Sequence, residues 1–153
     1  MPVTAGDRLE LEPGLVLEIL YPPPEPVVSP DANANNSSLV VKLTWQQASF
    51  LLTGDLEAEG EQWLLDNGKP IAATVLKLGH HGSDSSTTSN FLSAVAPSYA
   101  IISVGADNRF DHPAQSVLDR LDRQGNITLL RTDEQGAIDF VTDGQHLWIQ
   151  TER

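Results

Sequence analysis

Short apolar runs, each ended by glycine, proline or a polar cluster, recur along the chain and predict β-strands. The runs 39–45 and 48–53 are separated only by Gln46 and Gln47, which predicts a hairpin. Further strands are expected at residues 15–20, 73–78, 99–104, 127–130, 137–141 and 146–150. Residues 23–37 are rich in Pro, Asp, Asn and Ser, so we expect an exposed loop there.

Three segments between these strands carry the signals of helices. Residues 56–67 place apolar side chains at helical spacing and end at Gly68, and a short helix at about 90–95 stops before Pro97. A third helix is predicted to begin at Pro113 and to end near Gly125. Alternation of strands and helices, with antiparallel strands at both ends, predicts one α/β (α+β) domain over residues 1–153, with a mixed sheet and helices on at least one face.

The composition limits the function. With 9 Lys+Arg against 21 Asp+Glu, the net charge is −12, which argues against a broad surface for nucleic acid. The absence of cysteine excludes disulfides, thiolate catalysis and Cys-rich zinc sites. No apolar run reaches the ~20 residues of a membrane helix, so we expect a soluble chain that makes no membrane contact itself.

Polar and ionisable residues follow three of the predicted strands. Ligand sites of open α/β sheets form at the carboxyl ends of strands, so these residues are expected to converge on one edge. They are Asp55, His80, His81, Ser83, Asn108 and His112.

Each member of this group also has an ordinary structural explanation. Asp55 suits a helix N-cap, and the pair His80 and His81 could bond to carbonyl groups within a loop. His112 precedes a proline and could simply start its helix. Glycines on both sides of the histidine pair favour the functional reading, because they allow a tight turn and close approach of a ligand.

Chemically, the group suits part of a metal site. Aspartate and neutral imidazole bind Zn²⁺ or Mn²⁺, and such ions activate water and shield a phosphoryl or acyl oxygen during hydrolysis. A further histidine could position substrate or protonate a leaving group. A metal site usually needs three or four protein ligands, so Asp55 with one or two histidines is an incomplete set.

The same segments, in the same order, resemble the metallo-β-lactamase-like C-terminal domain of the ComEC competence proteins, which act in bacterial DNA uptake. The likeness rests on Leu-Leu-Thr-Gly-Asp-Leu-Glu at 51–57, Val-Leu-Lys-Leu-Gly-His-His-Gly-Ser at 75–83 and Asn-Arg-Phe-Asp-His-Pro at 108–113. It extends over nearly the whole chain.

The resemblance implies the later half to two-thirds of an αββα sandwich with a two-metal hydrolase site, and a nuclease that acts on DNA during natural transformation. By position, Asp55 matches the family's metal-bridging aspartate, and one of His80 and His81 matches a later histidine ligand, with the order slightly favouring His80. His112 matches an active-site histidine, and Ser83 and Asn108 would be its neighbours.

One departure changes what is expected of this chain. The family's His-x-Asp/His-x-Asp-His metal motif is absent, because none of the four histidines precedes residue 80. We therefore expect a partial domain of a protein of the bacterial inner membrane, with weak or no binding of Zn²⁺ or Mn²⁺ and no activity on its own. Single-stranded DNA is the expected substrate of the parent protein.

Two other functions stay open. The first alternative is a non-catalytic module for folding or interaction, and the second is an esterase or lactonase that acts on small molecules. Because a partial sandwich lacks the half that would cover one face of its sheet, that face is expected to drive formation of homo-oligomers.

Overall fold

The computed structural model describes residues 3–25 and 34–153, and within these ranges the chain forms a mixed α/β structure. The strands are β1 Arg8–Glu12, β2 Leu15–Tyr21, β3 Val40–Trp45, β4 Ala48–Leu52, β5 Val75–Lys77, β6 Tyr99–Ile102, β7 Thr128–Arg131, β8 Ile138–Thr142 and β9 Leu147–Thr151. The α-helices are α1 Ala58–Asp66, α2 Ser89–Val95, α3 Gln115–Gln124 and α4 Thr132–Gln135, and two 3-10 turns lie at Ala34–Ser37 and Gly79–Gly82.

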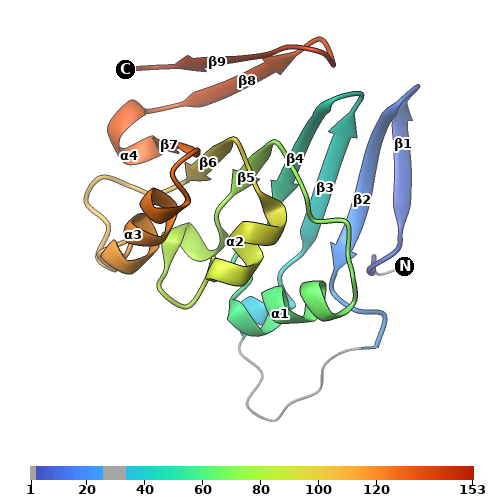
Figure 1. Ribbon diagram of the computed structural model, residues 1–153, viewed down its shortest axis with the longest axis horizontal. Helices are drawn as coiled ribbons and strands as arrows, with labels where there is room; N and C mark the ends of the chain where they lie inside the picture. The colour runs from blue at the N-terminus through green and yellow to red at the C-terminus, as the bar shows by residue number, and fades with distance from the viewer. Residues whose placement is uncertain (1–2, 26–33) are drawn as a thin grey trace.

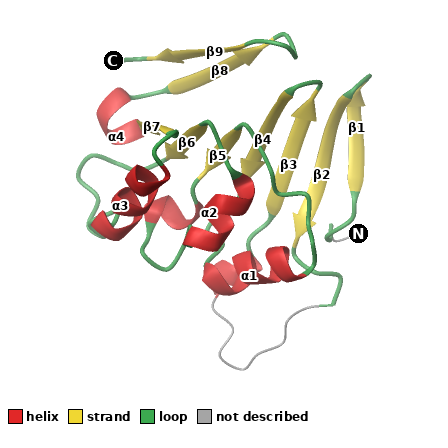
Figure 2. Cartoon of the chain, in the orientation of Figure 1, coloured by secondary structure: helices red, strands yellow, loops and turns green. Residues whose placement is uncertain are grey.

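The first seven strands form one sheet in sequence order, and β8 pairs with β9 in a separate hairpin. Strands β1 to β4 are antiparallel, whereas β4 to β7 are parallel. Parallel neighbours need crossover connections, and these run through α1, α2 and α3. Since such crossovers are right-handed and always step in the same direction, all three helices lie on one face of the sheet (Figures 1 and 2). The expected mixed sheet is confirmed.

The helix-covered face holds the main core. Leu51, Leu76 and Ala100 are register partners on adjacent strands, and each is fully buried. They belong to one cluster with Leu64 of α1 and Phe91 of α2. Removal of such side chains from water is the main stabilising term of the fold.

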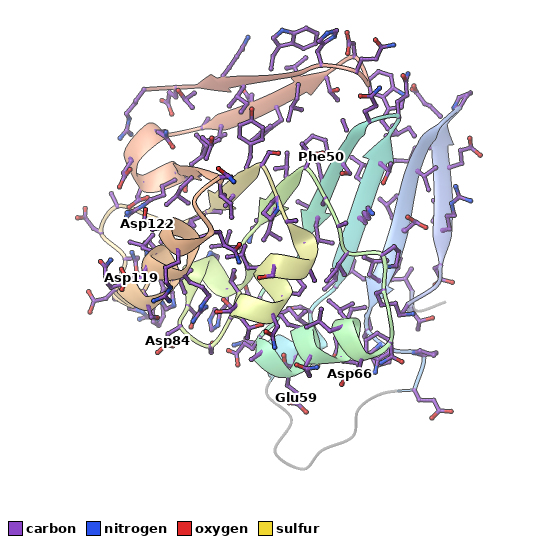
Figure 3. The ribbon with its side chains drawn as sticks, viewed as in Figure 1. Phe50, Glu59, Asp66, Asp84, Asp119 and Asp122 are labelled. Carbon is purple, nitrogen blue, oxygen red and sulfur yellow. The ribbon has the colours of Figure 1, made fainter. Side chains whose placement is uncertain are left out.

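The opposite face is also apolar and is covered in part. Leu17, Leu43 and Phe50 are register partners on this face. Phe140 of β8 contacts Phe50 and Tyr99, with ring centroids 5.9 and 6.1 Å apart, so the β8–β9 hairpin packs over the β4–β6 end (Phe50 is labelled in Figure 3). Leu17 and Leu43 stay half-buried. Self-association through this face remains a prediction.

The helix boundaries follow the expected end signals, with one exception. Thr88 caps α2 by accepting the Phe91 backbone N–H, and Gly125 ends α3 in the left-handed region. The predicted start of α3 at Pro113 is wrong, because the helix begins at Gln115 after the N-cap Ala114. Pro113 instead closes the preceding loop, which positions His112.

The expected loop at 23–37 is described only in part, because residues 26–33 lie outside the described ranges. Its last residues form the first 3-10 turn and pack against neighbouring elements. The Tyr21 hydroxyl donates to the Asn36 carbonyl, and the Asn36 side-chain oxygen accepts the Glu57 backbone N–H.

Candidate active site

The carboxyl ends of β4, β5 and β6 bring one carboxylate and three imidazoles together. The Asp55 Oδ1 atom lies 3.7 Å from His81 Nε2. The His80 ring lies 6.4 Å from the His81 ring and 5.6 Å from the His112 ring, measured between centroids. These three strands are parallel and adjacent, so the loops that follow them meet at one edge of the sheet.

Two histidines adopt backbone angles that side chains seldom allow. His80 has φ 45° and His81 has φ 55°, both in the left-handed region. Such strain concentrates at functional sites, where the surrounding structure holds it in place. The flanking glycines make this turn possible: a Cβ on Gly79 would lie 2.5 Å from the Leu56 carbonyl, and one on Gly82 would lie 2.8 Å from Pro113. The lack of a side chain at Gly79 and Gly82 thus allows Leu56 and Pro113 to pack closely against this turn.

His81 presents one ring nitrogen to Asp55. Its Nδ1 lies 2.6 Å from the Ser103 carbonyl, which can only accept, so Nδ1 carries the proton and donates it. Nε2, the other ring nitrogen, faces the Asp55 carboxylate, and in the neutral ring it is the atom with the lone pair. Two ligands of one tetrahedral zinc ion stand about 3.4 Å apart, so the observed 3.7 Å fits joint ligation of a single ion.

Asp55 does not act as a helix cap. The N-cap of α1 is Glu57, and it makes no side-chain capping bond. The Asp55 backbone N–H donates to Ser38 Oγ, and its side chain is 44% exposed beside His81. The ordinary explanation for this carboxylate therefore fails.

His80 is paired with a carboxylate that the sequence did not single out. The Glu57 Oε1 atom lies 3.0 Å from His80 Nδ1 and also accepts from Asn35 Nδ2 at 2.8 Å. Burial by itself raises the pKa of Glu57, but hydrogen bonds from Asn35, Ser85 and His80 outweigh it and hold the pKa below its usual value. Glu57 therefore fixes the His80 ring through Nδ1 and leaves Nε2 available. Its sequence signal is its place two residues after Asp55, at the end of the motif 51–57.

His112 lies next to His80, with ring centroids 5.6 Å apart. Burial lowers the pKa of His112, the nearby His80 and His81 lower it further, and Asp84 and Asp111 oppose the shift. Burial also lowers the pKa of Lys77, at the end of β5, against the influence of Asp55. The lowered pKa of His112 favours the neutral imidazole, which can bind a ligand or accept a proton.

The side chain of Asn108 holds the loop that carries His112. Its Oδ1 accepts the backbone N–H groups of Phe110 and His112 at 3.2 and 2.9 Å. Its Nδ2 donates to the carbonyl groups of Gly105 and His112 at 3.1 and 2.7 Å. Asn108 therefore lies next to the site, as expected, but its amide is occupied by the backbone.

We expect Asn108→Ala to loosen this loop while the sheet stays folded. The substitution removes four hydrogen bonds, each contributing roughly 0.5–1.5 kcal/mol net. Amide exchange at Phe110 and His112 should rise about tenfold or more, whereas exchange in β5 should not change. Asn126→Ala, at an exposed position, is the matched control. Unchanged exchange at both loop amides would contradict the positioning role.

Ser83 lies beside the histidine turn but is turned into the protein. It is 5% exposed, its hydroxyl lies 2.9 Å from Ser85 Oγ, and its backbone N–H donates to the His80 carbonyl. The structure thus brings Asp55, His80, His81 and His112 together, and gives Ser83 contacts within its own loop.

Two charged side chains form hydrogen bonds with the polar loop that follows the histidines. Glu61 of α1 is 2% exposed and accepts the backbone N–H groups of Thr87 and Thr88. Arg120 of α3 donates to the carbonyl groups of Ser86 and Thr87. The loop is therefore fixed to both neighbouring helices, and it supports the His80 turn.

The donors of this chain fill only part of a metal site. Among the described residues, no group of three or more His, Cys, Asp or Glu side chains is arranged to hold a metal ion. Asp55 and His81 fit two positions, and a complete site needs at least one more protein ligand.

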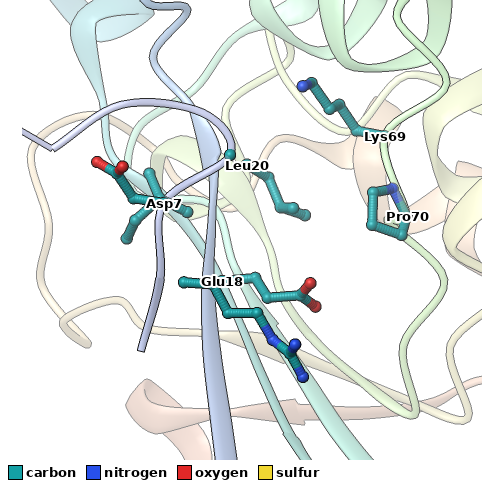
Figure 4. Close-up of a pocket in the computed structure, with 8 residues that line it drawn as sticks. Asp7, Glu18, Leu20, Lys69 and Pro70 are labelled. Carbon is teal, nitrogen blue, oxygen red and sulfur yellow. The ribbon is translucent and has the colours of Figure 1, made fainter. Parts of the chain in front are cut away.

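A shallow pocket of about 140 Å³ lies near β1 and β2, where the cations Arg8 and Lys69 accompany the acids Asp7 and Glu18 (Figure 4). Its mixed charges favour no particular ligand. Among residues 3–25 and 34–153, no helix is long and apolar enough to cross a membrane.

Comparison with known proteins agrees with the mixed α/β fold. The model of the metallo-β-lactamase superfamily matches residues 9–106. The chain is 45% identical to ComE operon protein 3 of Bacillus subtilis over 90% of its length, and 43% identical to competence protein ComA of Neisseria gonorrhoeae over 69%. It is 44% identical to recombination protein 2 of Haemophilus influenzae over 58%. The matches cover 17%, 15% and 11% of these relatives, so the chain spans only a small part of their length.

Proposed function

Because this chain belongs to the metallo-β-lactamase superfamily, we propose that its histidine-bearing edge is part of a metal-dependent site that hydrolyses phosphodiester bonds in DNA during natural transformation. The observation that carries the proposal is the 3.7 Å approach of Asp55 Oδ1 and His81 Nε2. The names of the similar proteins, which refer to competence and recombination, support DNA as the substrate.

Each side chain has a distinct part in this proposal. Asp55 and His81 would hold the ion, and the hydrogen bond from His81 Nδ1 to the Ser103 carbonyl fixes the ring so that Nε2 stays on the side of Asp55. His80, oriented by Glu57, would bind or protonate a substrate oxygen, and the neighbouring His112, as the neutral imidazole, would bind substrate or accept a proton. When bound, a divalent ion supplies Lewis-acid stabilisation of the charge on a phosphoryl oxygen.

The remaining ligands are proposed to come from a segment outside these 153 residues. Asp55 and His81 supply two ligands, and within residues 3–25 and 34–153 no group of three or more His, Cys, Asp or Glu side chains is arranged to hold an ion. The relatives are several times longer than this chain. The parent protein is proposed to lie in the bacterial inner membrane and to act there on single-stranded DNA.

The test is Mn²⁺- or Zn²⁺-dependent cleavage of single-stranded DNA and of a chromogenic phosphodiester. It compares this chain with a version that carries about a hundred further residues upstream, the remainder of a large single domain. We expect cleavage by the longer version only. Cleavage by neither would favour the non-catalytic module, and turnover of esters or lactones in place of phosphodiesters would favour the small-molecule hydrolase.

A further inference from the structure

The loop that carries His112 also presents an apolar ring to solvent. Phe110 is 63% exposed, which makes it the most exposed large hydrophobic side chain of the described residues. It lies in the loop between β6 and α3, next to the histidines. An aromatic ring held in water at this position is available for contact with a ligand.

The ring is held in a defined stack. It lies 5.9 Å from the His112 ring at an interplanar angle of 22°. The Arg109 guanidinium carbon lies 4.9 Å from its centroid, within cation–π range. The Phe110 backbone N–H is bonded to Asn108, so the loop does not have to be ordered when a ligand binds.

Arg109 is the one Lys or Arg of the loop between β6 and α3, which also carries the exposed acids Asp107 and Asp111. Exposed acids project from α1, α3 and the loop before α2, and Figure 3 labels Glu59, Asp66, Asp84, Asp119 and Asp122. These carboxylates repel a polyanion from the helix layer. No ion pair joins Arg109 to a carboxylate within residues 3–25 and 34–153, so its guanidinium is free to meet a phosphate.

We propose that Arg109 and Phe110 form the binding surface for the nucleotide that flanks the cleaved bond. Arg109 pairs with a phosphate, and an unpaired base takes the place on the Phe110 ring that the guanidinium occupies in the free chain. The Phe110 ring contacts His112, and the His112 ring contacts His80, so this surface adjoins the histidines. The inference rests on the proposed action on nucleic acid.

This arrangement selects single strands. Stacking requires a free base face, which a single strand offers and a duplex covers with neighbouring base pairs. One cation and one ring make a local contact, which does not need the broad basic surface that the net charge of −12 argues against.

The test measures binding to the 153-residue chain without metal, in EDTA and at low salt. The probes are a labelled oligothymidylate, the same oligomer with abasic sites, and a duplex. We expect the single strand to bind, the abasic oligomer and the duplex to bind at least fivefold more weakly, and Phe110→Ala to weaken single-strand binding about tenfold. Phe110→Trp should preserve binding, and Arg109→Ala should weaken it and reduce its salt dependence.

Two matched variants control for general effects. Trp148→Ala removes another exposed ring, on β9, and Arg123→Ala removes another exposed cation, on α3; both should bind like the unmodified chain. Equal binding by Phe110→Ala, equal binding of the abasic oligomer or duplex, or no binding at millimolar oligonucleotide would each overturn the inference.

The binding and cleavage assays together distinguish failure of the nucleotide surface from failure of the hydrolase proposal. If Phe110→Ala loses binding while no version of the chain cleaves a phosphodiester, the nucleotide surface stands and the hydrolase proposal falls. If the longer version cleaves single-stranded DNA and Phe110→Ala leaves its KM unchanged, the hydrolase proposal stands and the nucleotide surface is wrong.

Discussion

Replacement of Glu61 by leucine should lower the free energy of unfolding by about 2–5 kcal/mol. The carboxylate is 2% exposed and accepts the N–H groups of Thr87 and Thr88, which lose their acceptor in the variant. Each unsatisfied buried donor costs roughly 1–3 kcal/mol. Arg120 also loses a nearby opposite charge. The loss should appear as a lower midpoint in urea unfolding, with an unchanged slope.

Two further variants separate this bond from general effects on α1. Glu61→Gln keeps one acceptor oxygen but turns its amide nitrogen toward the second N–H. Its loss of stability should therefore be smaller than that of Glu61→Leu. Glu59→Gln, at an exposed position on the same helix, should change stability by less than about 0.5 kcal/mol. A Glu61→Leu protein as stable as the Glu59→Gln protein would show that the loop is held by other contacts.

The pH dependence of the same variants gives an independent check. Burial raises the pKa of Glu61 above 4.5, against the opposing influence of its bonds to Thr88 and Thr87 and of Arg120. The folded state therefore holds this proton more tightly than the unfolded state does. The contribution of Glu61 to stability is greatest below the unfolded pKa and falls as the pH rises through the folded pKa. Glu61→Gln should remove this fall.

The position of the site could be predicted from the sequence because the topology is simple. Strands that alternate with helices become parallel neighbours, and residues that follow them, such as Asp55, His81 and His112, meet at one edge. Periodicity and end signals located the elements that build this edge. The short helix α4 was missed, because four residues give no periodic signal.

The pairings within the site could not be predicted in the same way. The resemblance left open which of His80 and His81 is the ligand, with the order Gly-His-His slightly favouring His80, whereas the structure places His81 beside Asp55 and His80 beside Glu57. The choice depends on two consecutive left-handed residues and on the Ser103 carbonyl, which lies 22 positions away in the chain. Such contacts are set by tertiary packing and leave no local pattern.

In the longer version of the chain, Asp55→Ala should reduce metal-dependent phosphodiester cleavage at least about 100-fold. A metal ion supplies several kcal/mol of transition-state stabilisation, and each 1.36 kcal/mol corresponds to a factor of ten in rate. The effect should fall on activity and on Mn²⁺ or Zn²⁺ affinity and leave stability nearly unchanged, because the carboxylate is 44% exposed. Asp107→Ala, an exposed acid of the loop after β6, is the matched control.

The two neighbouring histidines should respond differently in the same assay. His81→Ala removes the nitrogen that faces Asp55, so it should weaken metal affinity about as much as Asp55→Ala does. His80→Ala removes a ring that Glu57 orients, so it should lower activity with a smaller loss of metal affinity, and Glu57→Gln should reproduce part of that loss. Isothermal titration with Zn²⁺ and cleavage rates, measured on all four variants, would establish this order. A larger loss of affinity in His80→Ala than in His81→Ala would reverse the assignment and favour His80 and His112, whose ring centroids lie 5.6 Å apart, as the ligands.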